Sequence, residues 1–359
     1  MGMNRPSFSD RVRGSLLGGA VGDALGAGVE FMSLAEIRRV AGPMGVADYM
    51  EAYGRTGAIT DDTQMTLFTA EGLLRAWVRS AERGICGVSG VINHAYLRWL
   101  LTQGERPAAG VEVGTDGWLF DVSGLHSRRA PGNTCLSALR VSKGFASPPI
   151  ARNDSKGCGG VMRVAPVGLF APAIGPDDRV FEMASDAAAL THGHPAGYLA
   201  AGYLAVVVAR LVQGEELSVA LDAADRCLKG RPGSAEVRRA VDAAREMARG
   251  GRPTPEQLEG LGGGWVAEEA LAIGICCAIV ARDFADGVIL AVNHSGDSDS
   301  TGSIAGNLLG AQMGIEAIPA RWLDRLELRA EIERISGDLA AVAVGERDAD
   351  ELARHYPGW

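Results

Sequence analysis

The sequence has few aromatic residues, no surplus of positive charge and no cysteine pattern typical of a metal or disulfide scaffold. Phe, Trp and Tyr make up 6% of the 359 residues, and the formal net charge is −9. A protein that coats nucleic acid needs clustered Lys and Arg, so this charge argues against that class. The six cysteines show no CxxC or Cys/His ligand spacing. We therefore expect free, buried thiols and a cytoplasmic protein.

Long apolar runs and strand-like alternation are missing as well. No stretch reaches about 18 uninterrupted apolar residues, so we expect no transmembrane helix and no membrane partner. Asp10 and Asp23 interrupt the apolar N-terminal run, which argues against a signal peptide. With a 47% apolar composition and no βαβ rhythm, the sequence predicts an all-α fold. We expect one compact many-helix domain over residues 1–359, with its core at about 9–345.

Glycine is abundant, with 49 residues, and it recurs at every fourth position in two predicted helices. An interior glycine costs about 1 kcal/mol relative to alanine, so four would cost about 4 kcal/mol unless something compensates. Close backbone contact with a neighbouring helix supplies such compensation. The spacing therefore predicts that the two helices form a tightly packed central pair. The two sets are Gly14, Gly18, Gly22 and Gly26, and Gly302, Gly306, Gly310 and Gly314.

Other helices are predicted from apolar periodicity and capping residues. Ser33 and Glu36 form a capping box for a short helix that ends at Gly42. Ser234 is expected to cap the helix over 234–249. The region 104–132, rich in glycine and proline, is predicted to be a long loop. The first glycine-rich helix is expected at 9–29, and the others at 62–79, 88–103, 133–143, 178–191, 196–213, 217–228, 266–283, 285–293, 301–314 and 329–343.

Two short segments, far apart in the sequence, combine carboxylates with hydroxyl groups. Thr60-Asp61-Asp62-Thr63 begins one predicted helix, and Asp297-Ser298-Asp299-Ser300-Thr301 begins another. Hard divalent cations such as Mg²⁺, Mn²⁺ or Ca²⁺ prefer such oxygen ligands. Carboxylates at a helix start can also be N-caps, which accounts well for one aspartate in each segment and poorly for two. The two segments therefore predict a cation site that forms where they meet.

Three further features are weaker candidates for function. Glu30 follows the first glycine-rich helix, and His192 lies between two predicted helices. The glycines of the segments 131–134 and 154–163 are suited to cradle a phosphate group. Each feature has an ordinary alternative: an exposed helix end, a hydrogen-bonding loop residue, or a simple turn. Trp265, like the other tryptophans considered, shows no stacking pattern, and we expect it to serve core or loop packing.

In sequence order, these pieces resemble the ADP-ribosylglycohydrolase family. The resemblance runs from about Gly14 to Gly314 and implies an all-α orthogonal bundle with a binuclear Mg²⁺ centre, in which Mn²⁺ is an alternative. The segments that carry it are 18–26 with Glu30-Phe31-Met32, then 60–63, 157–166, 190–192 and 296–300. The positions that match the family's metal ligands are Thr60, Asp61, Asp62, Asp297, Asp299 and Ser300.

The resemblance also implies an activity, namely hydrolysis of the bond between C1″ of ADP-ribose and an acceptor. Glu30 and Asp62 match catalytic positions, with Glu30 near the scissile bond. Cys158 stands where a Gly-Asn-Gly-Gly pattern is common, so one side-chain amide is lost there. The residues expected to contact the substrate are Gly132, Asn133, Thr134, Ser155, Gly157, Cys158, Gly159, Gly160, Met162 and His192.

The acceptor stays open at this stage. The Glu30-Phe31-Met32 string resembles the nitrogenase-regulating branch and favours arginine on a protein. ADP-ribosylated serine, O-acetyl-ADP-ribose and ADP-ribosylated nucleobases contain the same ADP-ribose group as ADP-ribosylated arginine. Nucleic acid is expected as a partner only in the form of such a modified substrate. A non-catalytic ADP-ribose-binding or crystallin-like protein is the alternative of another class, and the retained acidic residues argue against it. A phosphohydrolase that cuts the pyrophosphate would release AMP in place of ADP-ribose.

Overall fold

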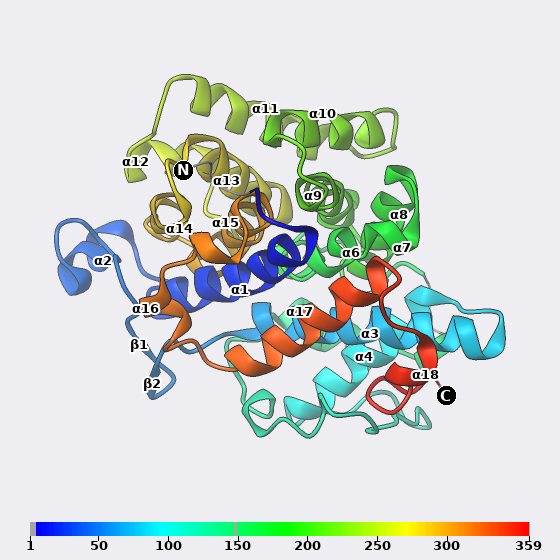
Figure 1. Cartoon of the computed structure of the whole chain (residues 1–359). Helices are drawn as coiled ribbons and strands as arrows, with labels where there is room; N and C mark the ends of the chain where they lie inside the picture. Colours follow the sequence, from blue (N-terminus) through cyan, green and yellow to red (C-terminus); the bar gives the residue numbers. More distant parts are fainter. Residues whose placement is uncertain (1–4, 147–148, 359) are drawn as a thin grey trace.

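Two glycine-rich helices, α1 (Phe8–Gly26) and α15 (Ser298–Met313), run side by side through the middle of the molecule (Figure 1). The computed structural model describes residues 5–146 and 149–358. The glycines of the two helices face each other in antiparallel order. A Cβ atom built on Gly14 would lie 2.5 Å from the carbonyl oxygen of Gly310, and one on Gly18 would lie 2.5 Å from that of Gly306. The predicted central pair is therefore confirmed, and its backbones touch directly.

The remaining helices surround this pair (Figure 1). Helices α9, α13, α14 and α17 pack against α1 or α15, while α3 and α4 pack against each other. The other elements are α2 (Leu34–Ala41), β1 (Glu51–Ala52), β2 (Arg55–Thr56), α3 (Asp61–Arg83), α4 (Val88–Thr102), α5 (Asn133–Arg140), α6 (Ala165–Leu169), α7 (Ala171–Ile174), α8 (Asp177–Ala189), α9 (Pro195–Val212), α10 (Leu217–Leu228), α11 (Ala235–Arg249), α12 (Pro255–Leu258), α13 (Ala267–Val280), α14 (Phe284–Val292), α16 (Ala320–Leu323), α17 (Arg329–Ala343) and α18 (Ala349–Leu352).

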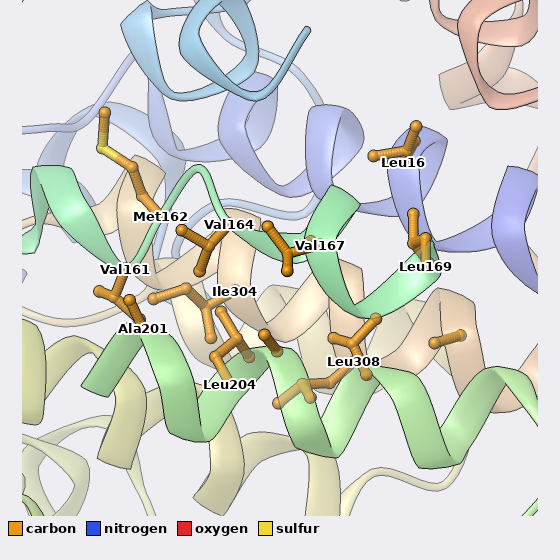
Figure 2. Packing of buried hydrophobic residues seen from close by; sticks show 14 of the residues in the cluster. Leu16, Val161, Met162, Val164, Val167, Leu169, Ala201, Leu204, Ile304 and Leu308 are labelled. Carbon is orange, nitrogen blue, oxygen red and sulfur yellow. The ribbon is translucent and has the colours of Figure 1, made fainter. Parts of the chain in front are cut away.

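Helix α9 lies in the centre of the apolar core. By length and composition it is the one helix among the described residues that could cross a membrane, but 83% of that stretch is buried inside the molecule. Figure 2 shows Leu204 of α9, Val167 of α6 and both Ile304 and Leu308 of α15 gathered in one apolar layer. All four side chains are fully buried. Burying one such side chain contributes about 1.5–3 kcal/mol, so α9 is a core helix of this fold.

Most predicted helices are present, with boundaries that differ by a few residues. The capping box of Ser33 and Glu36 at the start of α2 is confirmed, and the loop over 104–132 holds only a short 3-10 turn. The first helix ends at Gly26, so Glu30 lies in the turn that follows it. Ser234 precedes α11 as expected, but its side chain makes no capping hydrogen bond because its backbone is already helical.

Several short elements were not predicted from the sequence. The two-residue strands β1 and β2 pair as an antiparallel hairpin through Glu51 with Thr56 and Ala52 with Arg55. The helices α6, α7, α12, α16 and α18 each have only four or five residues. One or two turns are too short to show a helical period, so such elements take their conformation from tertiary contacts.

We expect Gly22→Ala to destabilise the protein by about 3 kcal/mol, because the new methyl group would overlap the carbonyl group of Gly302 and force the backbones apart. Gly337, inside α17, is the matched control, since a Cβ there meets no atom within 4 Å. Gly337→Ala should gain about 0.5–1 kcal/mol through helix propensity alone. Chemical denaturation of both variants measures the difference, and equal stabilities would contradict the backbone contact.

Candidate active site

The antiparallel helix pair brings the end of α1 against the start of α15. A side chain at Gly26 would overlap the backbone of Ser298 and Asp299, so this contact tolerates only glycine at that position. The turn after α1 then carries Glu30 to the acidic segment of α15, with the Glu30 amide donating to the Gly26 carbonyl at 3.0 Å. One carboxylate oxygen from each of Glu30, Asp297 and Asp299 lies within 4.8 Å of the other two.

Asp23, on the buried face of α1, fixes the second acidic segment. Its carboxylate accepts hydrogen bonds from the backbone amides of Thr60 at 3.0 Å and Thr63 at 3.1 Å. These are orphan donors at the start of α3, where a negative charge also interacts favourably with the helix dipole. From the sequence, Asp23 was interpreted only as a charge that interrupts the apolar N-terminal run and as part of the segment 18–26. A carboxylate in the middle of an otherwise apolar helix was the signal that could have identified its role.

One cavity of about 360 Å³ collects nearly all the predicted site residues. Three predicted residues do not line it: Thr60, which caps α3, the half-buried Ser155 and the buried Gly160. Five other residues that line the cavity had not been assigned to the site from the sequence: Ala130, Pro131, Cys135, Phe31 and Trp265. The predicted residues that line the cavity are Glu30, Asp61, Asp62, Gly132, Asn133, Thr134, Gly157, Cys158, Gly159, Met162, His192, Asp297, Asp299 and Ser300.

Hydrogen bonds tie the two acidic segments to the neighbouring loops. The Gly132 amide donates to an Asp61 oxygen at 3.3 Å. The Cys158 thiol donates to the carboxylate of Asp297 at 2.8 Å. Asp297 also accepts from the Ser300 amide at 3.3 Å, so it does cap α15 as well as lining the cavity. Capping and cavity lining are thus combined in one residue.

The site concentrates negative charge away from water. Burial, followed by the charges of Asp299, Asp297 and Asp61, raises the pKa of Glu30 to about 11. Burial and Asp299 raise the pKa of Asp23 to about 7. The pKa values of Asp61, Asp62 and Asp297 are also raised, in each case by burial and then by Asp299. A group of carboxylates that oppose one another's ionisation is the environment that a bound cation would relieve.

The donor set at the cavity fits a hard cation. Asp62 is almost fully buried, yet one of its oxygens, Oδ1, has no hydrogen-bond partner in the described chain. Glu30 likewise has a buried oxygen, Oε2, without a partner among the described residues. Buried polar atoms are normally satisfied, so these two oxygens indicate a missing ligand. Carboxylates and the nearby Ser300 hydroxyl are the oxygen donors that Mg²⁺ and Mn²⁺ prefer.

The glycine loop and His192 line the same cavity. The Gly157 amide donates to the Ser155 hydroxyl at 3.3 Å, and the Cys158 amide donates to the Trp265 carbonyl at 3.1 Å. These two amides are therefore engaged within the protein and are not free to hold a phosphate. His192 is buried beside Thr191, with Nδ1 and the hydroxyl 2.9 Å apart. Burial and the charge of Arg163 lower the pKa of His192 to about 3, so its imidazole is neutral.

Two aromatic residues form part of the cavity rim beside Glu30. The rings of Phe31 and Trp265 stack with centroids 5.3 Å apart and an angle of 20° between their planes. Trp265 was expected to serve core or loop packing; it is not in the core but packs on Phe31, and it also lines the cavity, which was not predicted. The stack joins two segments far apart in the sequence, and no local pattern encodes such a contact.

Comparisons with known proteins agree with this fold. A family model described as ADP-ribosylglycohydrolase matches residues 4–349. The ADP-ribosyl-dinitrogen reductase glycohydrolase of Rhodospirillum rubrum is 30% identical over 92% of this chain and 95% of its own. The ADP-ribosylarginine hydrolase Tri1 of Pseudomonas putida is 25% identical over 95% of this chain and 81% of its own. A solved structure titled ADP-ribosylglycohydrolase-related protein complex superposes with a TM-score of 0.70 at 28% identity, covering 94% of this chain and 99% of that one.

An all-α bundle with an acid-lined cavity, together with these relatives, defines a hydrolase of glycosidic bonds. The chain belongs to the ADP-ribosylglycohydrolase family, because the family model spans nearly its whole length. The resemblance carried by the glycine and aspartate motifs is thereby confirmed.

The metal-free protein is expected to lose thermal stability as the pH rises from about 5 to about 8. The pKa values of Asp23 and Glu30 are higher in the folded than in the unfolded state, so the folded state binds more protons above a pH of about 4. The protonated form of Asp23 favours the folded state, and this contribution to stability is lost as the pH rises through the folded pKa of Asp23, about 7. Melting curves in EDTA test this, and added Mg²⁺ should flatten the dependence. A Tm that rises over this range in EDTA would contradict the prediction.

Proposed function

We propose that this protein releases ADP-ribose from modified arginine side chains by hydrolysing the N-glycosidic bond at C1″, and that it needs divalent cations to do so. The observation that carries the proposal is the meeting of Glu30 with the acidic starts of α3 and α15 in one cavity. The arginine acceptor is supported by the relatives, one named for ADP-ribosylarginine and one for ADP-ribosylated dinitrogen reductase. The free cysteines fit a reducing, cytoplasmic location.

The residues that would hold two Mg²⁺ or Mn²⁺ ions come from both helix starts. Bound cations would offset the buried negative charge and orient the distal ribose hydroxyls and a water molecule. The cavity-facing donors are four aspartates and one hydroxyl, while Thr60 supports them from behind as the cap of α3. The ligands proposed are Thr60, Asp61, Asp62, Asp297, Asp299 and Ser300.

Glu30 is the residue that we assign to the scissile bond. It comes from the turn after α1 and so approaches the acidic cluster from a different element than the four aspartates. Its buried oxygen without a partner can exchange a proton with the leaving group or stabilise positive charge that develops at C1″. Asp62, whose own free oxygen lines the same cavity, is the second catalytic residue that we propose.

The substrate walls have two parts in this proposal. Asn133 and Thr134 at the start of α5, together with Gly132, would lie along the pyrophosphate. The segment from Ser155 to Gly160 would face the phosphate and adenosine, with Met162 and His192 beside the distal ribose. The Thr134 hydroxyl lies 3.0 Å from that of Ser155, so the two parts form a continuous wall.

Asp299→Ala should abolish turnover and weaken Mg²⁺ binding, because it removes a proposed ligand. The loss of stability should be small, because the variant also removes a buried charge that raises the pKa of the neighbouring acids. Asp242→Ala is the matched control, since Asp242 is an exposed aspartate on α11. Calorimetric titration of Mg²⁺ and a hydrolysis assay on ADP-ribosylarginine measure both effects. Turnover by Asp299→Ala at the wild-type rate would rule out the cation site.

Glu30→Gln keeps the shape of the side chain and should lower kcat by about 10²- to 10⁴-fold, the usual contribution of a general acid–base group. The variant should still bind ADP-ribose.

Wild-type protein should release intact ADP-ribose from an arginine-linked substrate, and chromatography of the products distinguishes this from AMP. If ADP-ribose were released from serine-linked, O-acetyl or nucleobase-linked substrates and not from the arginine-linked one, the arginine acceptor would be wrong. Tight ADP-ribose binding without any hydrolysis would indicate a binding protein.

A further inference from the structure

We propose that the stacked rings of Phe31 and Trp265 form an acceptor subsite that binds the guanidinium plane of ADP-ribosylated arginine. This inference rests on the proposed function and adds to it the residues that select the acceptor. Both rings line the same cavity as Glu30, which we assign to the scissile bond. The acceptor must leave on the side of Glu30, so the aromatic pair lies where the guanidinium would be.

Phe31 is held in a conformation that a bulky residue rarely adopts. Its φ is +70°, in the left-handed region, and one of the few such non-glycine positions in the described chain is Ala130 in the same cavity. Neighbouring backbone bonds hold the turn: the Met32 amide donates to Val29 at 3.0 Å, and the Leu34 amide donates to the Ser295 hydroxyl at 2.8 Å. Such backbone strain costs about 1–3 kcal/mol and clusters at functional sites.

The strain does not serve to bury the side chain, because Phe31 stays 68% exposed. A phenylalanine placed for stability would be buried, and a turn with this φ would be more stable with glycine. The remaining consequence of the strained turn is that it presents an aromatic face beside Glu30. The Trp265 ring is 42% exposed and contributes the second face.

Trp265 is anchored to the acidic cluster through its backbone. Its carbonyl accepts from the Cys158 amide at 3.1 Å, and the carbonyl of Gly263 accepts from the Asp297 amide at 2.8 Å. Gly264 between them has a φ of +78°, which lets the chain turn sharply and aim the ring at the rim. The indole therefore has a fixed position relative to Asp297.

An arginine acceptor matches this arrangement better than the alternatives. A guanidinium is a planar cation that stacks on aromatic faces, and the carboxylates behind the pair attract its charge. Serine and acetyl acceptors have no planar cation and would gain nothing from the rings. A nucleobase would stack as well, but its phosphate backbone would meet a protein of net charge −9.

The test compares Phe31→Leu and Trp265→Leu, which keep apolar bulk but remove the π face. Phe145→Leu is the matched control, because Phe145 is an exposed ring stacked on His94 at 4.0 Å and does not line the cavity. On an ADP-ribosylarginine peptide with Mg²⁺, each site variant should raise KM by about 3- to 30-fold with kcat nearly unchanged, the range expected for a cation–π contact. The Kd of free ADP-ribose should not change, nor should KM for a serine-linked peptide.

Each other outcome overturns the subsite in a distinguishable way. If the wild type cuts the arginine peptide and both variants match it, the rings do not recognise the acceptor and the proposed function stands. A fall in kcat without a rise in KM for Phe31→Leu would mean that Phe31 only positions Glu30. Trp265→Leu distinguishes this case, because Trp265 comes from a different segment than Glu30. If the wild type does not cut the arginine peptide, the proposed acceptor fails and the subsite fails with it. Ring-dependent cleavage of ADP-ribosylated DNA would assign the rings to a nucleobase.

Discussion

The direct backbone contact between α1 and α15 is the constraint on which the rest of this structure depends. Side chains would normally hold two helices 8–10 Å apart, but the opposed glycines let the backbones of α1 and α15 touch. The contact sets the register of the pair, because each glycine faces one particular partner. It also fixes where α15 begins relative to the end of α1. The acidic segment of α15 and Glu30 therefore meet as a result of helix packing and not through a flexible loop.

The site formed in this way opposes stability, since several carboxylates are buried together and raise one another's pKa. The protein supports this arrangement by rigid attachment. Asp23 takes the free amides at the start of α3, and Asp297 both caps α15 and accepts from the Cys158 thiol. A cation that binds only the folded state would add its binding free energy to stability. A destabilised site on a rigid frame is the usual arrangement where function requires concentrated charge.

Local periodicity explains what the sequence could predict. The four-residue spacing of glycine and the doubled aspartates are visible within a single helix, and each has a direct physical meaning. The positions of Asp23 and Trp265 were not predictable in this way, because their roles depend on contacts with segments distant in the chain. Ser234 shows the reverse case. Its residue type favours a cap, but its helical backbone angles take the side chain out of reach.

The acidic cluster and the aromatic pair of the cavity share one set of hydrogen bonds. Cys158 donates its thiol to Asp297 and its amide to the Trp265 carbonyl, while the Asp297 amide donates to Gly263 in the same loop as Trp265. These bonds form a closed ring of contacts, so the aromatic rim cannot move without disturbing Asp297. The amides of Cys158 and Asp297 are both engaged in this ring. Cys158, which the resemblance marked as a lost amide and a substrate contact, thus links the aromatic pair to Asp297, and under the proposed function it would couple the acceptor subsite to the cation ligands.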